Sequence, residues 1–396
     1  MTDFDPTATL AGAPDPWESS AQPSLRDGPP FHMTEMIAAE PAIARRILDR
    51  LADHHGPAGQ LAGAVGQAAS AGEPIVVTGC GTSEHAALGV VEILTEAIRA
   101  AGMHGGVGSV IAAQAFELAL DPSSRGLVIG VSHEGGTAAT NRALAASAAA
   151  GARTAMLTAS AGSPGGQLAE ITVETVELDH SWCHTVGYVS PMIAAASVGA
   201  HLSARSVAFE DVVALMAAGT QDEAGAEGIA GRLADARTLL VVGSGADRPA
   251  ARELVLKVEE ASWLPSAMRD LETFLHGHLP SMDGSTGLVL ILADRDGRAD
   301  RLTRARQALA AARVLGVRTA AILARELDED LEPSLTLAGR LLVDEAPSLP
   351  APVAALLGTA TPLQLLTERL ARARGTNPDP IRRDDPLYAE ASAAAE

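Results

Sequence analysis

The chain has 396 residues, of which 47% are hydrophobic and only 3% aromatic, and its formal net charge at pH 7 is −20. This length favours two domains, with cores built mainly from Ala, Leu, Val and Ile. The excess of negative charge repels phosphate backbones and therefore argues against nucleic acid as a partner.

The chain begins with a segment rich in Pro, Asp, Ser and Gly over residues 1–30, which we expect to be a disordered leader. A helical pattern starts at Phe31, and Pro41 is expected to break or kink it. No signal peptide and no apolar run long enough to span a membrane are apparent, so we expect a cytoplasmic protein.

Short apolar strands then alternate with helical stretches, a pattern that is typical of parallel sheets covered on both faces. The first half has strands near 74–79, 107–111, 126–132, 153–159 and 173–178, and a closing helix over about 189–218. The second half repeats this plan with strands at 238–245, 287–293, 317–323 and 339–345, and a helix ending at Gly375. We therefore predict a duplicated α/β unit, with domains at 31–220 and 221–374, a boundary near 217–228 and a tail at 375–396.

Two Gly-containing loops follow strands of the first half and precede helices. They are Gly79-Cys80-Gly81-Thr82-Ser83 and Ser132-His133-Glu134-Gly135-Gly136-Thr137. Backbone N–H groups and hydroxyls in such loops suit an anion, and loops at the carboxyl ends of parallel strands share one crevice. An ordinary capped turn is the alternative for each loop, and Glu134 would repel a phosphate. The corresponding loops of the second half, 243–247 and 293–297, lack these hydroxyls, so a single anion site is expected.

Lys257 is the only lysine among 29 basic residues. A helix over 249–263 would put Lys257 and Glu260 on one face, with Glu253 one turn earlier. His276 follows in a Gly/Pro-containing loop. A carboxylate, an amine and an imidazole can move protons along an opened sugar, although an ion pair on a solvated helix would have the same spacing.

Three further features carry less weight. The stretch 181–188 could line a pocket or belong to the core at a domain seam. Cys80 and Cys183 are too few for a disulfide framework and more typical of small buried residues. The pairs His54–His55 and His276–His278 lack the spacing of metal ligands, so no metal site is expected.

Several of these stretches together resemble the tandem SIS (sugar isomerase) half of glucosamine-6-phosphate synthase and its relatives. They are FHMTEMIAAEP, GCGTSEHA, VSHEGGTAAT, ARELVLKVEEASW, LHGHL and TPLQLL, and they extend from residue 31 to about residue 375. The resemblance implies two flavodoxin-like three-layer α/β/α SIS domains, no cofactor and a homodimer with the site at the subunit interface.

The resemblance also assigns roles. The two first-half loops would bind a sugar or sugar phosphate, and Glu134 stands where the family has a hydroxyl. Glu260 would move a proton between C1 and C2, Lys257 would polarise the developing oxyanion, and His276 of the neighbouring subunit would open the ring. The substrate-binding positions implied are Cys80, Gly81, Thr82, Ser83, Ser132, His133, Glu134 and Thr137.

Two departures from the family limit the activity. No glutaminase domain is apparent, and the tail GTNPDPIRRDDPLYAEA contains no lysine for a Schiff base, which argues against a synthase. The sequence therefore predicts an aldose–ketose isomerase or an amino-sugar deaminase or deglycase. A non-catalytic SIS sugar-phosphate sensor is the alternative.

Overall fold

The fold is described from a computed structural model, which places residues 4–10, 23–103, 110–204 and 208–395. The first half of the chain contains a five-stranded parallel sheet with the strand order β2-β1-β3-β4-β5. Its strands are β1 (Ile75–Gly79), β2 (Val110–Gln114), β3 (Leu127–Val131), β4 (Arg153–Thr158) and β5 (Ile171–Glu174). Every residue of β1 and β3 is buried, as expected of central strands covered by helices on both faces.

The helices of this half cover both faces of the sheet and extend from it to the second half. They are α1 (His32–Arg50), α2 (Pro57–Ser70), α3 (Thr82–Ala100), α4 (Ala115–Leu120), α5 (Ala138–Ala150), α6 (Pro164–Leu168), α7 (Val186–Ser203) and α8 (Phe209–Gly219). The closing helix predicted over 189–218 is two helices instead, because the chain leaves α7 at Ala204 in the left-handed conformation (φ 51°).

The second half contains another five-stranded parallel sheet, with the order β10-β9-β8-β6-β7. Read from β7, this is the strand order of the first sheet, so the predicted pair of pseudo-duplicated α/β domains is confirmed. Its strands are β6 (Thr238–Gly243), β7 (Ser266–Asp270), β8 (Thr286–Leu292), β9 (Arg318–Ala324) and β10 (Gly339–Val343). Its helices are α9 (Glu223–Leu233), α10 (Asp247–Ser262), α11 (Leu271–Phe274), α12 (Arg298–Val314), α13 (Ala351–Arg374) and α14 (Pro386–Ala393), with 3₁₀ turns at Leu279–Ser281, Arg325–Leu327 and Pro333–Leu335.

Helix α1 continues through Pro41 from His32 to Arg50, so the predicted break at this proline is wrong. Its apolar side chains at Met33, Met36, Ile43 and Ile47 are fully buried. Their burial stabilises the helix by more than the roughly 3 kcal/mol that an interior proline costs.

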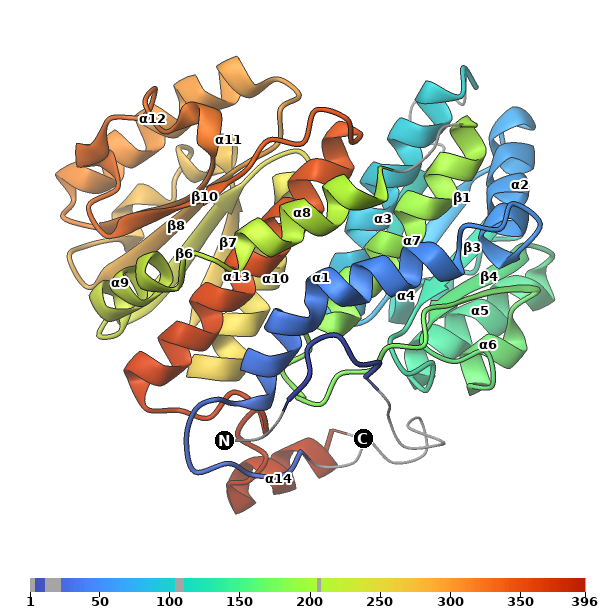
Figure 1. Ribbon diagram of the computed structural model, residues 1–396, viewed down its shortest axis with the longest axis horizontal. Coiled ribbons are helices and arrows are strands. Elements are labelled where there is room, and N and C mark those ends of the chain that lie inside the picture. Colours follow the sequence, from blue (N-terminus) through green and yellow to red (C-terminus); the bar gives the residue numbers. More distant parts are fainter. Residues whose placement is uncertain (1–3, 11–22, 104–109, 205–207, 396) are drawn as a thin grey trace.

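The two lobes meet through helices that belong to different halves of the chain. In Figure 1 the two sheets lie on either side of the molecule, with α10, α13 and α1 between them. Helix α10 packs against α13 of its own half and against α3 of the first. The α3–α10 contact is important for the site because α3 begins with Thr82 of the first loop and α10 carries Lys257 and Glu260. No helix among the described residues is long and apolar enough to span a bilayer.

Both ends of the chain pack on this framework. Leu10, within the predicted disordered leader, is 2% exposed and donates its backbone N–H to Glu177 at 3.0 Å, so this part of the leader belongs to the core. In the tail, the Asp379 carboxylate accepts the N–H groups of His32 and Met33 at 2.8 and 2.9 Å, at the start of α1. The Asp379 carbonyl accepts the N–H of Trp182 at 3.0 Å.

Candidate active site

Glu253, on α10, connects the helix that carries Lys257 to the loop at 79–83 and the start of α3. Its Oε2 lies 2.8 Å from Nδ1 of His85, and its Oε1 accepts the Thr82 hydroxyl at 3.3 Å. The same Oε1 lies 3.8 Å from Nζ of Lys257, one turn further along α10. The Glu253 and Lys257 side chains are 0% exposed. The two motifs, more than 160 residues apart in the chain, therefore meet in one buried cluster.

Lys257 and Glu260 form a close ion pair on the same face of α10. The Lys257 Nζ donates to Glu260 Oε2 at 2.5 Å, and the Glu260 side chain is 22% exposed whereas that of Lys257 is fully buried. Lys257 is thus covered by the protein, and Glu260 is the member of the pair that an outside molecule can contact.

The pKa shifts of Lys257 and Glu260 indicate different roles for the two side chains. Burial alone would lower the pKa of Lys257, but the carboxylates of Glu260 and Glu253 outweigh it and raise that pKa, so the side chain stays an ammonium. Burial raises the pKa of Glu260 above its ordinary value, and Lys257 only partly opposes this. A carboxylate with a raised pKa is a stronger base than an ordinary one and can accept and return a proton, and a fixed ammonium can stabilise a developing oxyanion.

A loop that sequence reasoning left undecided completes the cluster. Residues 181–188 follow β5, and within them Cys183 is fully buried and lies close enough to Glu260 and Lys257 for its pKa to depend on them. Burial raises the pKa of the Cys183 thiol, so it stays protonated. The signal for this placement was the group of Cys, His and Thr after the last strand of the sheet. Glu253 was placed one turn before Lys257 from the sequence but given no role, and His85 was not singled out.

The side chain of His133, a position that the resemblance assigns to substrate binding, is buried. Its side chain is 5% exposed, and its Nε2 accepts the backbone N–H of Asp179 at 3.0 Å. The Asp179 carboxylate in turn caps α7 by accepting the N–H groups of Thr185, Val186 and Gly187 at 2.7 to 3.0 Å. The physical reason is that a neutral imidazole can stay buried when its acceptor nitrogen has a donor. His133 thus braces the loop between β5 and α7.

The two first-half loops lie side by side, as predicted. They follow β1 and β3, which are neighbours at the point where the strand order reverses, the usual ligand-binding edge of such sheets. The Cys80 Sγ lies 3.7 Å from Thr140 Oγ1, which links the first loop to α5. Ser132 and Thr137 pair through their hydroxyls at 3.0 Å.

The other residues of these loops differ in how open they are. Gly81 is exposed with φ 57°, Ser83 is buried at the start of α3, and Glu134 is half-buried. The N–H groups of Ser83 and Glu84 at the start of α3 are bonded to the Cys80 and Gly81 carbonyls, so the groups that these loops could offer to an anion lie mainly at the start of α5 and on the Ser132–Thr137 hydroxyls.

Gly135 is required by the geometry of the second loop. Its φ is 74°, and a Cβ there would lie 2.0 Å from Ser163 Oγ. We expect Gly135→Ala to lower the free energy of unfolding by about 2 to 4 kcal/mol, because it combines left-handed strain with a clash. Gly63→Ala, in α2 with nothing within 4 Å of its Cβ, is the matched control and should be neutral or slightly stabilising. Urea unfolding of both variants measures the difference.

The corresponding loops of the second half are occupied by the protein's own carboxylates. Asp247 accepts the backbone N–H groups of Ala293 and Asp294 at 3.1 to 3.2 Å. Asp294 accepts the N–H of Ala246 at 3.0 Å and pairs with Arg301 at 2.5 Å. The donors that would bind an anion are already used here, which gives a physical reason for the single anion site expected from the sequence.

His276 is not brought to Lys257 and Glu260 within one chain. Its side chain is 67% exposed, and its Nε2 lies 2.7 Å from Oε1 of Glu272, which also pairs with Arg304. It follows α11, just beyond the edge strand β7. The sequence of this strand, SAMRD, is polar and lacks the apolar pattern typical of the other strands. Within a single chain, His276 is thus a surface residue.

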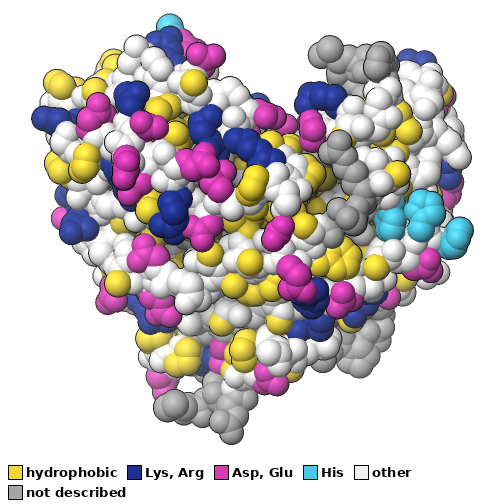
Figure 2. Space-filling view, turned by 45° about the horizontal axis from the view of Figure 1, so that its top comes forward, with side chains coloured by type: hydrophobic (Ala, Val, Ile, Leu, Met, Phe, Trp, Pro, Cys, Tyr) yellow, Lys and Arg dark blue, Asp and Glu magenta, His cyan; other side chains and the backbone are white. Residues whose placement is uncertain are grey.

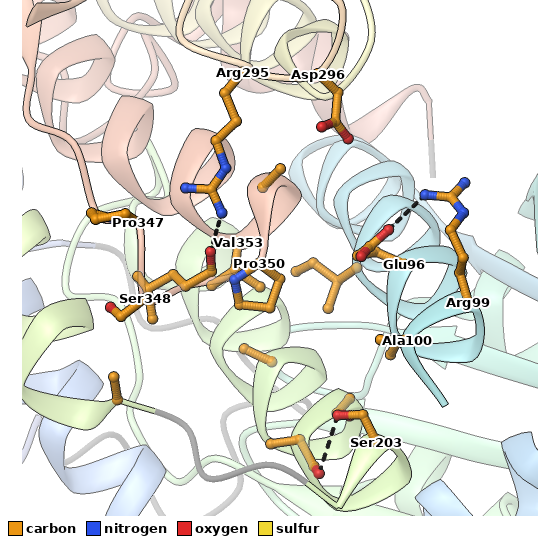
Figure 3. A pocket seen from close by; sticks show the side chains of 18 residues that line it. Glu96, Arg99, Ala100, Ser203, Arg295, Asp296, Pro347, Ser348, Pro350 and Val353 are labelled. Carbon is orange, nitrogen blue, oxygen red and sulfur yellow. Dashed lines mark hydrogen bonds and ion pairs between the residues drawn. The ribbon is translucent and has the colours of Figure 1, made fainter. Parts of the chain in front are cut away.

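A cavity of about 480 Å³ lies elsewhere, between the lobes. Its lining comes from α3, α7, the loop after β8 and the start of α13, and includes no residue of the two loops or of the Lys257 cluster. Figure 3 shows Arg99 turned to Glu96 and Arg295 turned to the backbone before α13. Both guanidinium groups therefore already have partners within the protein. Because its lining shares no residue with the two loops or the Lys257 cluster, this cavity is distinct from the candidate site.

His184 makes the site sensitive to acid. Burial lowers its pKa from 6.5 to about 4, despite the nearby Asp179. The unfolded chain therefore binds a proton between these values that the folded chain rejects, and stability must fall as the pH drops from 6.5 to about 4. We expect a loss of up to about 3 kcal/mol from this group, measured by urea unfolding across that range. His184→Gln should flatten the pH dependence, and an unchanged slope would contradict the assignment.

Comparisons with known proteins agree with this architecture. A family model of the SIS domain matches residues 232–353. The chain is 29% identical over 367 residues to a glutamine–fructose-6-phosphate aminotransferase [isomerizing] of Gloeobacter violaceus, covering 88% of this chain and 57% of that protein. The chain thus spans little more than half the length of that relative.

Two solved structures have the same fold. The C-terminal domain of glucosamine-fructose-6-phosphate aminotransferase from Francisella tularensis superposes with a TM-score of 0.75 at 18% identity, covering 90% of this chain and 99% of that one. Tagatose-6-phosphate ketose/aldose isomerase from Escherichia coli gives a TM-score of 0.70 at 19% identity, covering 91% and 97%. The resemblance inferred from the motifs is confirmed.

Proposed function

We propose that this chain, whose residues 232–353 are an SIS domain, is an enzyme that interconverts the aldose and ketose forms of a sugar or sugar phosphate. The observation that carries the proposal is the buried contact of Lys257 with Glu260, which Glu253 joins to the loop at 79–83. Aldose–ketose interconversion needs a group that moves a proton between C1 and C2 and a positive charge that stabilises the intermediate, and this cluster could supply both.

The chemistry follows from the protonation states. Glu260, partly exposed and with a raised pKa, takes a proton from one of the two carbons C1 and C2 and returns it to the other. The intermediate is an enediolate, and the positive charge of Lys257, which lies buried behind Glu260, favours its negative charge through space. Lys257 acts here as a cation and not as an amine nucleophile, because its carboxylate neighbours keep it protonated.

The loops at 79–83 and 132–137 hold the anionic end of the substrate in this proposal. Ring opening is assigned to His276 of a second copy of the chain, because within one chain this exposed imidazole does not contact the Lys257 pair. The proposal therefore includes a homodimer with the site at the subunit interface.

An amino-sugar deaminase or deglycase is the second candidate, and one observation favours it. Lys257 is flanked by two carboxylates, Glu253 and Glu260, so the cluster has an excess of negative charge when both are ionised. Such a cluster suits a substrate that carries an ammonium group. The proton transfer would be the same, and release of ammonia or an amine would distinguish this reaction.

The test is proton exchange with solvent. The protein is incubated in deuterated water with ketose and aldose phosphates and with their amino derivatives. Deuterium at C2 supports the enzyme, and ammonia formed with it identifies the deaminase. Tight binding without exchange for every sugar tested would overturn catalysis in favour of a sensor.

A further inference from the structure

The structure brings together two histidines that are far apart in the sequence. His54 lies in the turn between α1 and α2, and His201 lies near the end of α7. Their Nδ1 atoms are 3.4 Å apart, and their ring centroids are 5.4 Å apart. The ring centroid of His55 is 5.8 Å from that of His54. On the face drawn in Figure 2, histidine side chains gather on one lobe.

The tautomer of His201 is determined by the hydrogen bond that its Nε2 atom makes. Its Nε2 lies 2.9 Å from the carbonyl oxygen of Leu51, which can only accept, so this nitrogen carries the proton. In the neutral imidazole the lone pair is then on Nδ1, the atom that faces His54. A histidine whose second N–H is held by a backbone carbonyl has the orientation that metal-binding histidines adopt.

The separation of the two Nδ1 atoms fits a shared metal ion. Zinc–nitrogen bonds of about 2.0 to 2.1 Å at a tetrahedral angle place two ligand nitrogens about 3.3 to 3.4 Å apart. The observed 3.4 Å agrees with that value. As a hydrogen bond between two imidazoles the same distance is long, since such bonds are usually about 3 Å.

The backbone holds both histidines in place. The Leu51 carbonyl also accepts the Ser197 hydroxyl at 3.1 Å, so two successive turns of α7 anchor the start of the loop. A Cβ on Gly59 would lie 1.7 Å from the His54 carbonyl oxygen, which shows how tightly the loop presses on α2. An open cavity of about 430 Å³ lined by His54 and His201 leaves room for further ligands.

We propose that His54 and His201 bind one divalent transition-metal ion, such as Zn²⁺, Ni²⁺ or Co²⁺, through their Nδ1 atoms. Among the described residues, no group of three or more His, Cys, Asp or Glu side chains is arranged to hold a metal. The remaining positions therefore belong to water or to a small external ligand. The metal ties the loop before α2 to the end of α7, away from the Lys257 cluster.

The experiment titrates the untagged, chelator-treated chain with Zn²⁺ and Co²⁺. We expect one metal per chain, a rise in melting temperature on the order of a few degrees at tenfold excess over the dissociation constant, and a Co²⁺ absorption band in the visible range. His54→Ala, at an exposed position, should weaken binding at least tenfold, and His201→Ala should do the same. His276→Ala, which removes another exposed imidazole, is the control and should bind normally.

Circular dichroism of the metal-free variants checks that each is folded. Binding that is unchanged in both His54→Ala and His201→Ala, or the absence of any saturable binding by the unmodified chain, would overturn the proposal. Loss of binding in His276→Ala with retention in the other two would move the site elsewhere and also count against it.

Discussion

Replacing Glu260 by glutamine is expected to lower turnover at least 10²-fold while leaving sugar binding nearly unchanged. Glutamine has almost the same shape and can still accept a hydrogen bond from Lys257, so the pocket is preserved. It cannot accept and return a proton, and general acid–base catalysis contributes roughly 10²- to 10⁴-fold to rate. The effect should therefore appear in kcat with little change in KM.

The measurement is the rate of C2 deuterium exchange together with the dissociation constant of the same sugar. Glu259→Gln is the matched control, because Glu259 is the neighbouring glutamate on α10 and its Oε1 accepts the N–H of Ser266 at 3.0 Å at the start of β7. Full exchange activity in Glu260→Gln would remove this carboxylate from the proton-transfer role. Loss of binding with normal turnover would assign it to substrate recognition instead.

Replacing Lys257 by methionine is expected to abolish activity and to destabilise the fold by about 3 to 5 kcal/mol near neutral pH. Methionine fills a similar volume, but it leaves Glu253 and Glu260 without their cation in a buried environment. Removing one partner of a buried ion pair has this cost because the remaining charge is not compensated.

The pH dependence of this variant gives a second readout. Without the ammonium, the pKa of the Glu260 carboxyl in the folded state should rise further above its unfolded value. A group of this kind favours the folded state most at low pH and loses that advantage as the pH rises through the folded-state pKa. The stability difference between Lys257→Met and the unmodified chain should therefore shrink on acidification, and a constant difference would argue that lost packing is the cause.

Lys257→Arg tests whether charge alone is sufficient. The guanidinium is larger and planar, and the lysine site is fully buried with Glu260 Oε2 at 2.5 Å. We expect this variant to be inactive even though it keeps the charge. An unchanged rate would mean that the lone lysine of the chain has no specific role.

The sequence predicted the fold well because local patterns determine it. Buried parallel strands such as β1 and β3 are continuous apolar runs that alternate with helices. The i, i+3 spacing on one helix placed Lys257 beside Glu260. Polar and strained elements were harder to predict: strand β7 is a polar edge strand, and α1 tolerates Pro41 because its packing outweighs a local cost.

Contacts between distant segments could not be predicted from spacing. The pairing of His85 with Glu253 depends on how α3 crosses α10, and the inward turn of His133 depends on the Asp179 N–H. The histidine pair at 54 and 201 is another example, because nothing in the sequence around either residue indicates that the two imidazoles meet. In each case the deciding partner is more than 40 residues away.

The hydrogen bonds of Asp379 make the two ends of the chain dependent on each other. One side chain near the C-terminus satisfies the first amide groups of α1, and its carbonyl holds the segment that carries Cys183 toward Glu260. Shortening the protein before this aspartate would therefore fray the start of α1 and at the same time loosen the segment that contributes Cys183 to the candidate site. Tags and fusions would be better tolerated after Ala393, where helix α14 ends with no buried residue.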